Sequence, residues 1–226
     1  MKIGCLLHID PEPPASISQW AESRGYELLS SNFILEQPKH PLDELDLIIV
    51  LGGPFFTSDP KIALQLAEEK KYLKEAILLD KPVIGICFGM QLLGEILGAT
   101  TVESPVKEIG LSPIWLNNNA KLDPIVSLLP NSFEVFHFHS QMSELSKDSV
   151  VLAESAGCPV QIVRFAKVVY GFQCHLEADF ELIKSMTIDF PEKAALLENV
   201  STFDFSTTHQ LLYLFLDSLI KQMSSR

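Results

Sequence analysis

The apolar residues of this chain occur in short runs that alternate with stretches of helical periodicity. Leu45–Leu51 is a clear buried run that Gly52-Gly53-Pro54 terminates, and Pro82–Ile86 is a second that continues directly into a helical stretch from Phe88 to Leu97. Short apolar strands separated by amphipathic helices are typical of a sheet that is covered by helices on both faces. The alternation therefore predicts an α/β fold with an open, mostly parallel sheet.

The remaining segments extend this pattern and then change it. The first part of the chain predicts a strand at Ile3–Ile9 that the cluster Asp10–Pro14 ends, and helices at Ser16–Gly25 and Ile62–Leu79. After Gly110 the strand-like pieces follow one another without helices, at Ile114–Leu116, Phe133–Phe138, Val150–Glu154, Gln161–Phe165 and Val168–Cys174. We expect a β-rich, mainly antiparallel extension there, and helices again towards the C-terminus, most clearly at Gln210–Ile220. The sequence predicts a single domain over residues 1–226.

Composition excludes several classes of function. The 226 residues contain 17 Lys and Arg against 29 Asp and Glu, so the formal net charge is −12. A net negative charge is repelled by the phosphates of a nucleic acid backbone, so we expect no nucleic acid partner. No apolar span reaches the 18 residues of a membrane helix. Four dispersed cysteines (Cys5, Cys87, Cys158, Cys174) without metal-ligand spacing, and no signal peptide, predict free thiols in a reducing compartment, the cytoplasm.

Cys87 stands in the segment Gly85-Ile86-Cys87-Phe88-Gly89, between the predicted strand and the predicted helix. This is the pattern of a nucleophile elbow, in which a sharp strand-to-helix turn exposes the central side chain. Glycines are needed on both sides because a Cβ there would collide with neighbouring backbone. The helix N-terminus that follows favours the thiolate form of the cysteine. We interpret Cys87 as a nucleophile rather than a structural cysteine.

A thiol nucleophile needs a base, an orienting group and donors for the oxyanion. His175 and Glu177 lie two residues apart at the end of the last predicted strand, where both side chains could face one cleft. The backbone N–H of Phe88, directly after the nucleophile, and one from the Gly52-Gly53-Pro54 loop are candidate oxyanion donors.

Three blocks of the chain together resemble the class I glutamine amidotransferase domain in their order and spacing. They are Gly52-Gly53-Pro54, Gly85–Leu93 and Gly171–Glu177. Two further segments, Lys107–Ile114 and Phe133–His139, are similar to the free-standing branch of that family that resembles the glutaminase half of GMP synthase. The resemblance implies a flavodoxin-like fold.

The family resemblance also implies a mechanism and a set of site residues. The thiolate of Cys87 would attack the γ-carboxamide of glutamine, His175 would protonate the departing ammonia, and Glu177 would hold His175. Water would then cleave a γ-glutamyl thioester and release glutamate. By the same resemblance Gly53 and Phe88 would form the oxyanion hole, and Gly52 and Gln91 would bind the substrate. The resemblance implies no cofactor and no metal.

The chain departs from the family pattern at three places. Met90 stands where most members have a histidine or a similar residue, Ser140-Gln141-Met142 replaces a Gly-x-Asp-like segment, and Leu176 replaces a proline. The segment at Ser140–Met142 corresponds to the family's contact with the α-amino end of the substrate. A γ-glutamyl peptide or conjugate hydrolase with the same triad is therefore an alternative to a glutaminase. A non-catalytic binding or regulatory protein of the same fold is a third.

The sequence also bears on partners and metals. There is no G-x-x-x-x-G-K-[ST] phosphate loop and no segment for a synthetase, so an enzyme that accepts ammonia would be on a separate chain. His137 and His139 could provide two metal ligands from one strand, but no carboxylate or cysteine nearby in the sequence completes a set. We expect structural histidines, and we expect Cys174 to be a core residue.

Overall fold

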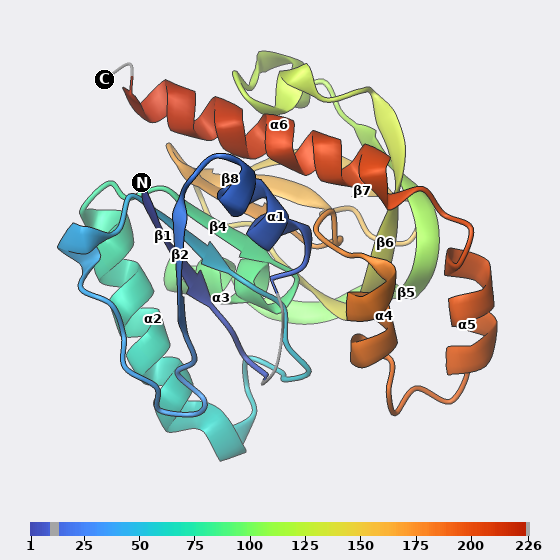
Figure 1. The fold of residues 1–226 in the computed structure, drawn as a ribbon, viewed down its shortest axis with the longest axis horizontal. Helices are drawn as coiled ribbons and strands as arrows, with labels where there is room; N and C mark the ends of the chain where they lie inside the picture. Colours follow the sequence, from blue (N-terminus) through green and yellow to red (C-terminus); the bar gives the residue numbers. More distant parts are fainter. Residues whose placement is uncertain (10–13, 225–226) are drawn as a thin grey trace.

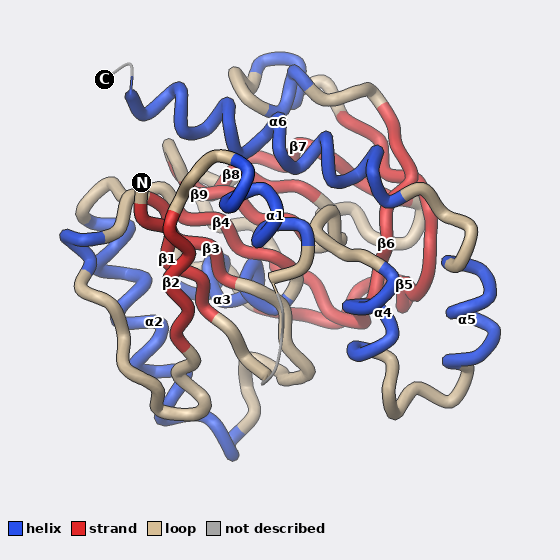
Figure 2. Tube along the Cα trace, in the orientation of Figure 1, coloured by secondary structure: helices blue, strands red, loops and turns tan. Residues whose placement is uncertain are grey.

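In the computed structural model, which describes residues 1–9 and 14–224, nine strands form one sheet with the order β2-β1-β3-β4-β9-β8-β7-β5-β6 (Figure 2). The strands are β1 (Lys2–Leu6), β2 (Glu27–Ser31), β3 (Leu47–Val50), β4 (Val83–Ile86), β5 (Thr101–Leu116), β6 (Ser132–Ser143), β7 (Val150–Ser155), β8 (Ile162–Ala166) and β9 (Val169–Phe172). The α-helices are α1 (Ser16–Ser23), α2 (Ala63–Leu78), α3 (Phe88–Ile96), α4 (Phe180–Met186), α5 (Lys193–Val200) and α6 (Phe205–Ser224).

The sheet has a parallel half and an antiparallel half that meet at β9. The strands from β2 through β1, β3 and β4 to β9 are parallel neighbours, whereas β8, β7, β5 and β6 pair antiparallel. This arrangement confirms the predicted α/β fold with a β-rich, antiparallel extension. Because β4 and β9 are adjacent and parallel, the segments that follow them emerge at the same edge of the sheet, where ligands bind in open α/β folds.

Helices cover both faces of the parallel half, as expected. Helices α1 and α6 lie on one face, against alternate strand residues such as Ile49 and Ile86. Helices α2 and α3 lie on the other face, against the intervening residues such as Ile48 and Val50 (Figure 1). Strands with apolar residues at successive positions are buried on both sides, which explains the continuous apolar runs in the sequence. Helices α4 and α5 pack separately, against β5 and β6.

One predicted strand has very different bounds, and another strand was missed. Strand β2 is an edge strand of mixed polarity that has no clear alternation, so its sequence does not predict a strand. Strand β5 begins at Thr101, well before the predicted piece at Ile114–Leu116, because two prolines and a bulge between Glu103 and Glu108 obscure its pattern. The predicted turn at Asp10–Pro14 lies outside the described residues except for Pro14.

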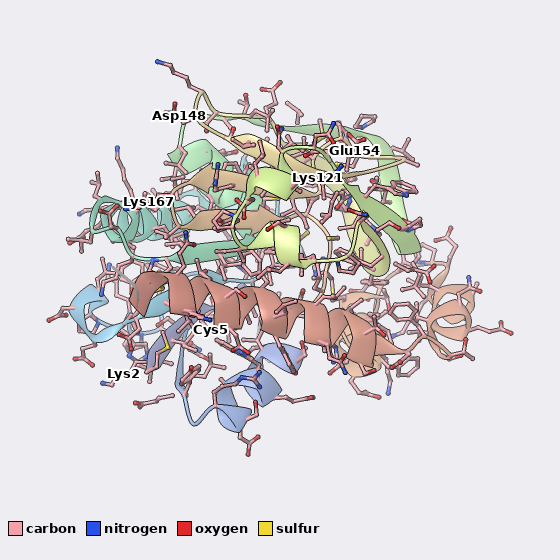
Figure 3. The ribbon with its side chains drawn as sticks, turned by 90° about the horizontal axis from the view of Figure 1, so that it is seen from above. Lys2, Cys5, Lys121, Asp148, Glu154 and Lys167 are labelled. Carbon is pink, nitrogen blue, oxygen red and sulfur yellow. The ribbon has the colours of Figure 1, made fainter. Side chains whose placement is uncertain are left out.

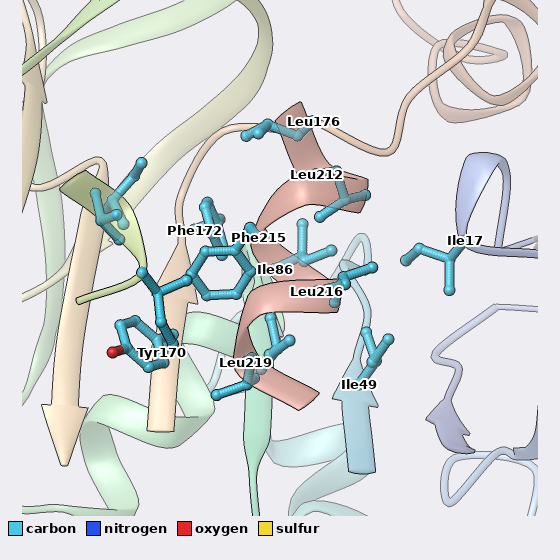
Figure 4. Packing of buried hydrophobic residues seen from close by; sticks show 14 of the residues in the cluster. Ile17, Ile49, Ile86, Tyr170, Phe172, Leu176, Leu212, Phe215, Leu216 and Leu219 are labelled. Carbon is cyan, nitrogen blue, oxygen red and sulfur yellow. The ribbon is translucent and has the colours of Figure 1, made fainter. Parts of the chain in front are cut away.

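Helix α6 covers the centre of the sheet. Its apolar face points towards β4 and β9 (Figure 4). The contacts join Leu212, Phe215, Leu216 and Leu219 of the helix with Ile86 of β4 and with Tyr170 and Phe172 of β9. The ring of Phe215 makes edge contacts with both aromatic rings of β9, at centroid distances of 5.2 and 4.9 Å. The predicted helix at Gln210–Ile220 is thus confirmed, and its apolar stripe is core.

We expect Phe215→Ala to lower the free energy of unfolding by about 3–5 kcal/mol, because it removes a fully buried ring from the cluster between α6 and β9. Leu214→Ala in the same helix is the matched control, since Leu214 is 40% exposed. It should change stability by less than about 1 kcal/mol. Urea denaturation of both variants measures the difference. Equal losses in the two variants would contradict the proposed role of α6 in the core.

Charged side chains and thiols are distributed as expected from the composition. Asp148 and Lys167 are exposed, whereas Cys5 lies inside on β1 (Figure 3). All four cysteines are buried, and none of them forms a disulfide. Among the residues that the structure describes, there is no helix with both the length and the apolar character required to cross a membrane.

Candidate active site

The turn between β4 and α3 has the geometry of a nucleophile elbow. Cys87 is the N-cap of α3 and has φ 52° and ψ −108°, a left-handed conformation that is strained for a residue with a side chain. A Cβ on Gly85 would lie 2.5 Å from the backbone of Gly89, and a Cβ on Gly89 would lie 2.2 Å from the carbonyl oxygen of Val50. Both glycines are therefore required by backbone packing, which is the reason predicted from the sequence.

The sheet fixes the position of Cys87. Its backbone N–H donates a 2.7 Å hydrogen bond to the carbonyl oxygen of Phe172, the last residue of β9. The side chain lines a cavity of about 540 Å³, and the residue is 8% exposed. The thiol of Cys87 therefore lies at a cavity that opens to solvent, a position that a purely structural cysteine does not need. By contrast, Cys174 is fully buried in the core, as predicted, and burial raises the pKa of its thiol well above the ordinary value.

His175 and Glu177 form a close pair next to Cys87. The distance between His175 Nδ1 and Glu177 Oε1 is 2.7 Å, and both side chains are almost completely buried. Strand β9 ends at Phe172, so the predicted reason for the shared orientation, strand alternation, does not hold. Instead, an isolated antiparallel bridge to Phe136 of β6 holds this segment, with a 2.9 Å bond from the His175 N–H.

The electrostatics of the pair favour a charged imidazole. Burial alone would lower the pKa of His175, but the Glu177 carboxylate and the neighbouring Cys87 raise it well above its ordinary value. His175 Nε2 has no hydrogen-bond partner among the described residues. Because Glu177 accepts from Nδ1, Nε2 is the nitrogen available to exchange a proton with Cys87 or a bound substrate. A thiolate–imidazolium pair is a suitable nucleophile and general acid.

The glycine loop after β3 lies against this pair. A Cβ on Gly52 would stand 3.3 Å from His175 Cε1 and 3.7 Å from Cys87 Cβ, so a side chain here would crowd the His175 ring. Gly53 and Phe88 both line the cavity beside Cys87. The structure therefore brings together both residues that were predicted to donate to an oxyanion.

The predicted substrate residue Gln91 also lines this cavity. It lies one turn after Cys87 on α3, and its Nε2 donates to the carbonyl oxygen of Gln141 at 3.2 Å. Ser140 and Gln141, which depart from the family pattern, line the cavity as well. The other two departures do not reach it. Met90 is buried against Gly171 of β9, and Leu176 belongs to the core under α6.

A carboxylate accompanies the two histidines of β6, contrary to the expectation that none lies nearby. Glu108 of β5 pairs with His139 across the strands, and its Oε2 is 3.2 Å from His139 Nε2 and 3.7 Å from His137 Nδ1. The sequence separation of 29 residues hid this contact. These three side chains have the spacing of metal ligands. Ser155 and Gln161 also donate to the carboxylate, at 2.8 and 2.6 Å, so hydrogen bonds satisfy it without a cation.

Burial and hydrogen bonds together set the protonation states of His137 and Glu108 in this cluster. Burial lowers the pKa of His137 to about 4, so its ring is neutral at pH 7 and Nε2–H donates to the Ser112 carbonyl oxygen at 3.2 Å. Burial would raise the pKa of Glu108, but the bonds from His139 and Ser155 hold it below its ordinary value. The absence of a metal from the site stays a prediction.

Two features at or beside the cavity have no motif in the sequence. The segment after α4 supplies one wall with Ile188, Asp189 and Phe190, which have no motif. His8, two residues after β1, contacts the glycine loop through a 2.8 Å bond from Nδ1 to the Gly52 carbonyl oxygen. The only available signal was a histidine at the end of the first strand, because the end of a parallel strand is a common place for functional residues.

Comparison with known proteins shows the family of this chain. The model of the family "Glutamine amidotransferase class-I" matches residues 16–190. The chain is 32% identical to the glutamine amidotransferase-like protein YfeJ of Salmonella typhimurium, over 97% of both chains. It is also 32% identical, over 58% of its length, to GMP synthase of Caldanaerobacter subterraneus, but it spans only 24% of that enzyme.

Solved structures show the same relationship. The crystal structure of SMU.1228c is 33% identical and superposes with a TM-score of 0.89, covering 97% of this chain and 99% of that chain. A glutamine amidotransferase from Thermotoga maritima superposes with a TM-score of 0.87 over 97% of this chain and 98% of its own. It is only 19% identical, so it supports the fold alone. With the family model and a relative of equal length in agreement, the chain belongs to the class-I glutamine amidotransferase family.

Proposed function

We propose that this chain is a hydrolase of γ-glutamyl amides that uses Cys87, His175 and Glu177, with glutamine as the first substrate to test. The observation that carries the proposal is the buried 2.7 Å pair of His175 and Glu177 beside a cysteine in a strained elbow at the wall of a cavity. A thiolate, an imidazolium and an orienting carboxylate are the groups that amide cleavage requires. Family membership gives the proposal further support.

In the first half of the reaction the Cys87 thiolate attacks the γ-carbonyl carbon, and the carbonyl oxygen becomes an oxyanion. Gly53 and Phe88 N–H groups would stabilise it. The His175 imidazolium donates its Nε2 proton to the γ-nitrogen, the carbon–nitrogen bond breaks, and ammonia leaves a γ-glutamyl thioester. In the second half neutral His175 takes a proton from water, the hydroxide attacks the thioester, and glutamate leaves as the thiolate and imidazolium are regenerated.

The test is a substrate panel on the isolated protein, with L-glutamine and with γ-glutamyl dipeptides. Release of glutamate is measured by an enzyme-coupled assay, and ammonia is measured separately. We expect turnover of at least one substrate. If none is cleaved, and a glutamine-like electrophile of the acivicin type fails to label Cys87, the hydrolase proposal is wrong and the protein is a non-catalytic member of its family. If ammonia is released from glutamine, a synthetase on another chain is the expected acceptor.

The cavity walls favour a second candidate, a hydrolase of γ-glutamyl conjugates that carry an apolar group. Four phenylalanines besides Phe88 line the cavity, namely Phe55, Phe56, Phe138 and Phe190. Free glutamine has no apolar end to contact them, and ammonia needs no such surface. Ligand pockets with aromatic walls bind ligands with an apolar portion. The chain's Lys107, which lies 5.6 Å above the Phe190 ring, adds a cation at the same wall.

For this second candidate we expect Phe190→Ala to raise KM for γ-glutamylphenylalanine about tenfold or more, because the buried ring contact is worth about 1.5–3 kcal/mol. KM for glutamine should change less than twofold, since free glutamine has no apolar group to contact the ring. Phe203→Ala is a matched control, because Phe203 lies outside the cavity wall and contacts the Phe205 ring. Steady-state kinetics with both substrates measure the effect. A uniform change for both substrates would contradict the selectivity.

A further inference from the structure

A buried acid–histidine pair lies behind the glycine loop of the active site. His8 Nε2 is 3.1 and 3.3 Å from the two carboxylate oxygens of Glu69 on α2, and the two side chains are 0% and 1% exposed. The other ring nitrogen, Nδ1, is 2.8 Å from the Gly52 carbonyl oxygen. A carbonyl oxygen only accepts, so Nδ1 carries a proton and donates it. Burying such a pair is costly unless its geometry is well satisfied, as it is here.

The bond from His8 determines which way the peptide between Gly52 and Gly53 faces. In a planar trans peptide the carbonyl oxygen and the following N–H point in opposite directions. Because the Gly52 oxygen is held by His8, the Gly53 N–H is directed away from His8. That N–H donates no hydrogen bond to any described residue, and Gly53 lines the cavity beside Cys87. Glycines on both sides of a peptide would otherwise let it rotate easily.

His8 also contacts the second oxyanion donor. Its ring meets the Phe88 ring edge-on, with a centroid distance of 4.7 Å. A Cβ on Gly53 would lie 2.8 Å from His8 Cβ, so the glycine loop packs directly on this histidine. Phe88 is the first residue of α3, where backbone N–H groups have no partner within the helix. One side chain thus contacts both residues that flank the expected position of the oxyanion.

We propose that His8, held by Glu69, is a positioning residue that keeps the Gly52–Gly53 peptide in the orientation that donates to the oxyanion. The oxyanion hole is then formed in the isolated chain and needs no partner protein to assemble. This inference rests on the proposed hydrolase function, since an oxyanion forms only in that reaction.

Two substitutions of His8 separate its two hydrogen bonds. The amide nitrogen of an asparagine superposes on imidazole Nδ1, and that of a glutamine superposes on Nε2. His8→Asn can therefore keep the bond to Gly52, whereas His8→Gln can keep only the bond to Glu69. We expect His8→Gln to lower kcat about 100-fold or more, the loss typical of one oxyanion donor, with KM within threefold. His8→Asn should stay within about tenfold of the wild-type kcat.

A second measurement separates positioning from general damage. Iodoacetamide alkylates a thiolate by displacing iodide, without an oxyanion, so its rate with Cys87 should be the same in His8→Gln and in wild type. Asp123→Asn is the control for lost stability, because Asp123 is a buried acid outside the cavity that binds Tyr170 and Arg164. It should lower the melting temperature but not kcat. The double variant His8→Leu/Glu69→Leu, which leaves no buried charge, replaces His8→Gln if that variant does not fold.

The outcomes are distinct. Wild-type kcat in folded His8→Gln, or an alkylation rate that falls in parallel with kcat, overturns the positioning role. If the wild-type protein cleaves no substrate, the hydrolase proposal fails, and the crystal structure of His8→Gln then decides the inference separately. A rotated Gly52–Gly53 peptide in that crystal structure supports it, and an unchanged peptide contradicts it.

Discussion

Cys87→Ala should abolish hydrolysis of every γ-glutamyl substrate, with kcat lower by about 10⁴-fold or more. Removing the nucleophile removes the covalent path, and the remaining groups act only on direct attack by water. The expected result includes normal folding, because alanine is smaller than cysteine and the elbow backbone is fixed by Gly85, Gly89 and the bond from residue 87 to Phe172. Steady-state kinetics and a melting curve on the same preparation measure both effects.

Cys158→Ala is the matched control for the loss of a thiol. Cys158 is also buried, but its Sγ lies 3.5 Å from the carbonyl oxygen of Val160, outside the cavity wall. The kcat of the Cys158→Ala variant should stay within twofold of the wild-type value. Labelling by an acivicin-type reagent should be lost in Cys87→Ala and kept in Cys158→Ala. Turnover that persists in Cys87→Ala would assign the chemistry to another residue and would remove the central assumption of the proposed mechanism.

Glu177→Gln should lower kcat/KM by about 10³- to 10⁴-fold and shift the alkaline limb of its pH profile to lower pH. The Glu177 carboxylate raises the pKa of His175, so the imidazolium persists well above pH 6.5 in the wild type. A neutral amide removes that attraction, and burial then lowers the pKa. Because activity needs protonated His175 as the acid, activity ends at a lower pH in the variant. Substituting the acid that orients a catalytic histidine typically lowers the catalytic rate by this factor.

Stability gives an independent readout of the same pKa. A histidine whose pKa is raised on folding stabilises the native state below pH 6.5, and this contribution is lost as pH rises through the raised pKa. The free energy of unfolding of the wild type should therefore fall as pH rises above 6.5, and the fall should be smaller in Glu177→Gln. Glu181→Gln, an exposed residue of α4, should not change either profile. If the alkaline limb of the kcat/KM profile does not move in Glu177→Gln, His175 does not control that limb.

Elements with strong local signals in the sequence were predicted correctly. The elbow at Cys87 was recognised because its glycines serve the local backbone, and the inner strands of the parallel half (β1, β3, β4 and β9) were recognised because both of their faces are buried. Elements with weak local signals were missed or shortened. Strand β2 is at an edge, and β5 owes its length to pairing with β6 and not to its own pattern. The pair of His175 and Glu177 was predicted correctly, but for a reason that the end of β9 at Phe172 removes.

The sequence by itself determined the fold class, the elbow at Cys87 and the pairing of His175 with Glu177, because each depends on residues that are close together in the chain. Only the tertiary structure decided what surrounds them. It brought Glu108 to the histidines of β6, Phe190 to the cavity wall, and His8 with Glu69 behind the glycine loop. These contacts join side chains that are 29 to more than 60 residues apart, or segments without a motif. These contacts form only when the sheet folds, so the local periodicity of the sequence cannot predict them.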